Sequence, residues 1–120
     1  MKPTPQELRE KLAYYTGTEQ WYRHPLNRGM LYTEGVECFA EEAGAYWFLD
    51  IVATEVFRLQ EAEHFLVIEL QVESSDVCRI VVSDGNDNDV WMRGIDYTDC
   101  PLGLWKFYLT DNVIMLPGEY

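Results

Sequence analysis

Apolar side chains recur at helical spacing up to about residue 62, and from residue 64 they alternate with polar ones. The first helix is predicted just after the N-terminus. Thr4 and Glu7 have the spacing of a capping box, which marks a helix start. Leu8, Leu12 and Tyr15 then follow as one apolar stripe, which is typical of a helix with one buried face.

Two further helices are predicted before the change of period. Thr33 is placed to cap a helix that ends or kinks at Gly44. The segment from residue 45 to about residue 60 has the strongest helical pattern, and such a helix is mostly buried. Its buried side would carry Ala45, Phe48, Leu49, Val52, Val56 and Leu59.

The second half of the chain predicts strands joined by short turns. Alternation predicts four or five strands, over residues 65–73, 78–83, 90–97, 104–110 and 113–116. Helices followed by consecutive strands predict an α+β fold, with N-terminal helices on one face of an antiparallel meander. A chain of 120 residues fits one domain, with a helical part at about 4–62 and a sheet part at about 64–117.

The acidic residues are unevenly distributed. The net charge is −12, yet residues 1–30 carry five basic side chains against three acidic ones, so residues 31–120 hold all of the excess acid. Such a field repels nucleic acid and anionic lipid and attracts basic protein surfaces. We therefore expect no direct contact with nucleic acid or membrane.

The compartment is predicted from cysteines and hydropathy. Three cysteines at wide spacing are a poor disulfide framework and favour a reducing compartment. We find no signal peptide, and the longest apolar run, residues 45–49, is too short to span a bilayer. The chain is expected to be cytoplasmic.

The first functional hypothesis is a carboxylate surface that binds a basic partner, such as a nucleic-acid-binding host protein of a defence, CRISPR or restriction system. The competing explanation is that the acid only maintains solubility. If Trp91 and Arg93 lie on the outer face of their strand, they add residue types enriched in binding hot spots. The acidic candidate contacts are Glu34, Glu37, Glu41, Glu42, Glu69, Glu73, Asp84, Asp87 and Asp89.

The alternative is a small enzyme with a site around residues 21–24 and 97–101. Asp99 would orient His24, and Cys100, the cysteine predicted to be most exposed, would be the reactive group. A hydrogen-bonded structural role for His24 is the competing interpretation. An assembly subunit without activity of its own, and an oligomer, are further possibilities.

Motifs for cofactors and metals are lacking. We find no phosphate-binding loop, dinucleotide motif or nucleophile elbow, so no cofactor is predicted. Asp84, Asn86 and Asn88 match three ligand positions of a calcium loop, but Asp89 and Ile95 stand where the loop needs Gly and Glu. A hairpin turn is the better interpretation, and no metal site is predicted.

Several segments together carry a family resemblance. The chain resembles a family of short bacterial proteins of unknown function, often carried on plasmids, prophages and other mobile elements. The resemblance implies no activity, cofactor or catalytic residue, but it implies a setting in which small acidic proteins act against host factors. The segments are GTEQWYRH at 17–24, LYTEGV at 31–36, AGAYWFLD at 43–50, YTDCPL at 97–102 and LPGEY at 116–120.

Overall fold

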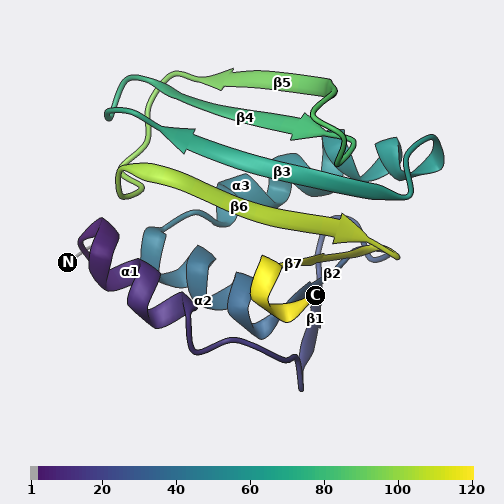
Figure 1. Cartoon of the computed structure of the whole chain (residues 1–120), viewed down its shortest axis with the longest axis horizontal. Coiled ribbons are helices and arrows are strands. Elements are labelled where there is room, and N and C mark those ends of the chain that lie inside the picture. The colour runs from purple at the N-terminus through teal and green to yellow at the C-terminus, as the bar shows by residue number, and fades with distance from the viewer. Residues whose placement is uncertain (1–2) are drawn as a thin grey trace.

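The computed structural model describes residues 3–120, and its first helices begin where the sequence predicts them (Figure 1). In α1 (Pro5–Leu12), the Thr4 hydroxyl accepts from the Glu7 amide, and the Glu7 carboxylate accepts from the Thr4 amide. In α2 (Glu34–Ala43), the Thr33 hydroxyl accepts from the amide of Val36. Both caps satisfy amides that the first helical turn leaves without partners.

The third predicted helix is present but changes type along its length. It comprises α3 (Tyr46–Ile51), a π-helical segment η1 (Val52–Val56) and a 3₁₀ segment η2 (Phe57–Glu61). The side chain of Asn27 donates to the carbonyl of Ala53 at 2.9 Å, so a loop from the N-terminal part is fastened to the π-helical segment. The predicted apolar side is buried here, except that Leu59 is only partly buried.

The described chain contains seven strands, and the predicted four or five are therefore too few. The two strands not predicted above are short and precede α2. The strands are β1 (Trp21–Arg23), β2 (Leu31–Thr33), β3 (Phe65–Val72), β4 (Cys78–Ser83), β5 (Asp89–Ile95), β6 (Gly103–Thr110) and β7 (Val113–Met115).

The predicted meander is also wrong, because the sheet order is β1-β2-β7-β6-β3-β4-β5. After β5 the chain returns across the sheet, and β6 pairs with β3 along its whole length. This pairing places Leu70, Ile68 and Leu66 opposite Trp105, Phe107 and Leu109, so one continuous apolar face results. β2 and β7 are parallel, and the other pairs are antiparallel.

The core lies between the helices and one face of this sheet. Phe39 of α2 and Phe48 of α3 are fully buried and contact Phe107 of β6, with ring centroids 5.0 Å and 4.9 Å away. Burying a side chain of this kind contributes about 1.5–3 kcal/mol. This contact fixes α2, so the opposite face of that helix points outward.

The C-terminus fastens the start of α2 to the sheet. Glu119, in the 3₁₀ turn η3 (Pro117–Glu119), accepts from the Thr33 hydroxyl at 2.7 Å and from the Gly35 amide at 3.2 Å. A Cβ on Gly35 would lie 2.6 Å from a carboxylate oxygen of Glu119, so only glycine permits this approach. Residues 31–36 and 116–120, two of the segments that carry the family resemblance, therefore meet in space.

Candidate functional site

The outer face of α2 carries four carboxylates around one hollow. Glu34, Glu37 and Glu41 follow at i, i+3 and i+7, and Glu42 lies beside them, so the helical pitch brings all four to one side. They line a cavity of about 300 Å³ with Tyr15, Tyr22 and Cys38. Glu34, Glu37 and Glu42 are half-buried there rather than fully exposed.

The charges of this acidic hollow work against the helix that carries them. Glu37 has a like-charged neighbour on each side, three and four residues away, and such pairs cost about 0.2–0.5 kcal/mol each. Glu41 and Glu42 lie in the last turn, where the helix dipole favours cations and the chain places none. Within residues 3–120, the one ion pair made by these four carboxylates joins Glu42 to Lys11. A glutamate in the first turn, such as Glu34, stabilises the helix, whereas Glu41 in the last turn does not.

Three tyrosines from outside α2 line the acidic hollow or bind one of its carboxylates. Tyr22 projects from β1, its ring stacks on Tyr32 at a centroid distance of 5.5 Å, and a hydrogen bond to Glu37 raises its pKa. Tyr15 follows α1. Its pKa is raised to about 12, mainly by a hydrogen bond to Cys38. Tyr46 of α3 donates to Glu41 at 3.1 Å, and burial with this bond raises its pKa to about 12. All three phenols remain neutral donors at physiological pH.

Carboxylates and aromatic rings around one hollow are groups that can interact with a cation. An arginine or lysine side chain gains hydrogen bonds from the carboxylates and a cation–π contact from a ring face. The hollow provides both kinds of group within one concave surface. Burial raises the pKa of the Cys38 thiol in the hollow, so this thiol is a weak nucleophile.

The other predicted acidic contacts lie elsewhere, so the nine residues do not form one surface. Glu69 projects from the sheet face away from the core, and Glu73 pairs with Arg79 at 3.3 Å. Asp84 accepts from the amides of Asn86 and Asn88, at 2.8 Å and 3.3 Å. These bonds organise the β4–β5 turn, as the hairpin interpretation predicts, and they lower the pKa of Asp84. Asp87 is exposed in the same turn, and Asp89 is exposed at the start of β5.

Trp91 and Arg93 face the helical side of the sheet. Their strand partners Val82 and Ile80 are fully buried, and Trp91 packs against the core. The guanidinium of Arg93 forms an ion pair with Glu55. The outer face of β5 instead presents Val90 and Met92.

The structure separates the two segments of the alternative enzyme site. His24 is 2% exposed, and its Nε2 donates to Asp50 at 2.9 Å. Its Nδ1 accepts from the amides of Leu26 and Asn27, so three hydrogen bonds hold the ring in place. Asp50, rather than Asp99, therefore orients His24.

The second segment of that site lies at the far end of the sheet. The connection from β5 to β6 carries it, while β1 lies at the other edge of the sheet (Figure 1). Asp99 is exposed, whereas Cys100 is 4% exposed, so the prediction of an exposed thiol is wrong. Thr98 turns this connection inward, because its hydroxyl accepts from the Cys100 amide. The thiol thereby joins the core.

Sequence reasoning missed the aromatic members of the acidic hollow. Tyr15 was assigned to the apolar stripe of the first helix, and Tyr22 to the segment at 21–24 of the alternative enzyme site. The signal that could have found them is the two pairs of aromatic residues at 14–15 and 21–22, which precede the glutamates of α2 in the sequence. In residues 3–120, no group of three or more His, Cys, Asp or Glu residues is close enough to hold a metal ion.

The chain is thus an α+β protein with a hollow lined by carboxylates and tyrosines. The chain belongs to a family of unknown function, DUF6876, whose model matches residues 6–120. No curated protein and no solved structure matches it. Among the described residues, none of the helices has the length and apolar character needed to cross a bilayer.

Proposed function

We propose that this protein is an interaction module whose acidic hollow binds a basic protein surface. The observation that supports this most is the placement of Glu41. It lies in the last turn of a helix, four residues after another glutamate, where acid destabilises the helix. Acid needed only for solubility would not have to gather in a hollow beside tyrosine rings.

The partner has the chemistry of a nucleic-acid-binding protein. Such proteins present arginine and lysine side chains spaced to meet phosphates, and the carboxylates of α2 offer a comparable row of negative charges. The chain itself would repel nucleic acid, so it would occupy the basic surface as a competitor. Carriage on mobile elements, expected from the resemblance, would make the partner a host defence or restriction component.

The test is affinity capture from a bacterial lysate with four forms of the immobilised protein. The first is the unaltered chain, and the second is Glu37→Gln/Glu41→Gln. The third is Asp76→Asn/Asp96→Asn, which removes the same charge from exposed loop positions outside the hollow. A fourth form, Asp87→Asn/Asp89→Asn, examines the other predicted acidic group.

We expect the unaltered chain and the Asp76/Asp96 variant to retain a nucleic-acid-binding protein that elutes as salt rises. The Glu37/Glu41 variant should lose it. The proposal is contradicted by equal capture with all four forms, by equal loss in the Glu37/Glu41 and Asp76/Asp96 variants, or by loss confined to the Asp87/Asp89 variant.

A further inference from the structure

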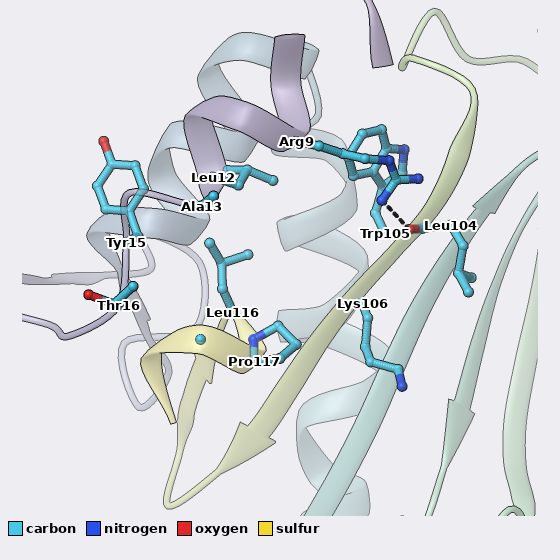
Figure 2. A pocket seen from close by; sticks show the side chains of 11 residues that line it. Arg9, Leu12, Ala13, Tyr15, Thr16, Leu104, Trp105, Lys106, Leu116 and Pro117 are labelled. Carbon is cyan, nitrogen blue, oxygen red and sulfur yellow. Dashed lines mark hydrogen bonds between the residues drawn. The ribbon is translucent and has the colours of Figure 1, made fainter. Parts of the chain in front are cut away.

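A second cavity lies on the other side of Tyr15, between α1, the first half of β6 and the C-terminal turn (Figure 2). Its volume is about 350 Å³, at the lower end of the range for ligand sites. The walls are mainly apolar, and they include Leu12 and Ala13 from α1 and Leu116 and Pro117 from the C-terminus. We call this cavity the β6 notch.

The floor of the β6 notch is an unpaired strand edge. β6 and β7 are joined by the two-residue loop Asp111–Asn112, with positive φ at both positions, which makes Thr110 and Val113 a hydrogen-bonded pair. The register continues to Tyr108 and Met115, and the next hydrogen-bonded pair would join Lys106 to Pro117. Proline has no amide hydrogen, and the chain turns away into η3 at this point.

The backbone of Lys106 and Leu104 therefore faces the β6 notch. Alternation along β6 directs the N–H and C=O of these two residues to the β7 side, while those of Trp105 point to β3. Figure 2 supports this direction, because the Leu104 carbonyl points toward Arg9, whose Nη1 lies 3.5 Å away. Among residues 3–120, no turn, loop or side-chain hydrogen bond reaches the N–H or C=O of Lys106.

Arg9 gives the β6 notch a fixed positive end. Its guanidinium carbon lies 4.4 Å from the centroid of the buried Trp105 ring, so a cation–π contact holds it in place. A Cβ on Gly103 would come within 2.6 Å of the guanidinium, so the glycine leaves room for this position. A carboxylate is the natural partner of a preorganised guanidinium.

We propose that the β6 notch binds the C-terminal end of a partner chain as an added strand. The segment would pair with Lys106 in place of the interrupted β7, antiparallel to β6. This direction carries its C-terminal carboxylate toward Arg9, and an apolar side chain near its end fills the space beside Leu12 and Leu116. Backbone pairing supplies affinity and the pocket supplies selectivity, as in other strand additions.

The probes are four fluorescein-labelled pentapeptides that end in valine, leucine, isoleucine or phenylalanine, titrated by fluorescence anisotropy. Each is compared with its C-terminal amide and with a form whose backbone nitrogen opposite Lys106 is methylated. Ala13→Trp fills the β6 notch from an exposed position, and Ala62→Trp is the matched control at an exposed position after η2. Arg9→Gln tests the carboxylate contact.

We expect at least one carboxylate peptide to bind, the amide and Arg9→Gln each to weaken it by about tenfold or more, and Ala13→Trp and the methylated peptide to abolish it. Ala62→Trp should bind normally. No binding by any peptide at millimolar concentration, or equal binding of the methylated forms, overturns the proposal. Glu37→Gln/Glu41→Gln should bind the peptides unchanged, so this site and the acidic hollow can fail separately.

Discussion

The carboxylate of Glu119 accepts a hydrogen bond from the hydroxyl of Thr33 at 2.7 Å, across 86 residues of sequence. Thr33 also caps α2, and Glu119 further accepts from the amides of Gly35 and Leu116. A negative charge at a helix N-terminus is stabilised by the amides and the dipole there. The C-terminus of the chain thus holds the helix that carries the acidic hollow.

Removing this carboxylate should destabilise the fold strongly. Glu119→Ala deletes hydrogen bonds from two backbone amides and two hydroxyls, and it leaves the buried Gly35 amide without a partner. We expect a loss of about 2–4 kcal/mol in the free energy of unfolding, measured by urea titration of tryptophan fluorescence. Glu61→Ala, at an exposed position in η2, is the control and should change it by less than about 0.5 kcal/mol. Similar losses in both variants would contradict the role of Glu119.

Neutralising the acidic hollow should stabilise the protein while it weakens binding. Glu37→Gln/Glu41→Gln removes the like-charge pairs on α2 and one unfavourable charge in its last turn. We expect the free energy of unfolding to rise by about 0.5–1 kcal/mol at low salt, with a smaller rise at high salt. Asp76→Asn/Asp96→Asn should leave it nearly unchanged. A decrease in the Glu37/Glu41 variant would mean that these carboxylates serve the fold.

The environments of Tyr15 and Tyr46 can be tested by titration at high pH. The pKa values of Tyr15 and Tyr46 rise to about 12 from an ordinary value of 10.0. Because both folded values lie above the unfolded one, this contribution to stability is complete below pH 10 and is lost as pH rises toward 12. Ultraviolet difference titration of the folded protein should therefore show two late phenolates. Cys38→Ala should move Tyr15 to a lower pKa, whereas Cys78→Ala should not.

The cysteines should react in an order set by burial. Cys38 is half-buried beside the acidic hollow, whereas Cys78 and Cys100 are 5% and 4% exposed. A disulfide-exchange reagent should modify Cys38 first in the folded protein, and slowly, because burial raises the pKa of that thiol. Cys78 and Cys100 should react only when the protein unfolds locally or globally. Fast modification of Cys100 in the Cys38→Ser variant would restore the alternative enzyme hypothesis.

Local signals predicted the N-terminal helices and the five strands after residue 64, but not β1 and β2. Thr4 and Thr33 cap the helices expected of them, and Gly44 ends α2 at a φ of 63°. The alternation from residue 65 onward marked five strands correctly within a few residues. Each of these features depends on side chains that are close in sequence, so one sequence is enough to read them.

The order of the strands in the sheet could not be predicted from such local signals. No local pattern near Leu104 predicts that β6 pairs with β3 rather than with β5, because this pairing depends on how the apolar faces of whole strands match. The candidate site divided in the same way. The spacing of Glu34, Glu37 and Glu41 was readable, but the approach of Tyr15 and Tyr22 is a tertiary contact.

The most direct test of the central claim is a competition titration with the captured partner. Duplex DNA is bound to that partner, and the unaltered chain is then added at constant salt. We predict that the chain displaces the DNA in proportion to its concentration, and that Glu37→Gln/Glu41→Gln fails to do so. Undisturbed DNA binding at saturating protein, or equal displacement by the variant, would contradict a carboxylate surface that takes the place of phosphates.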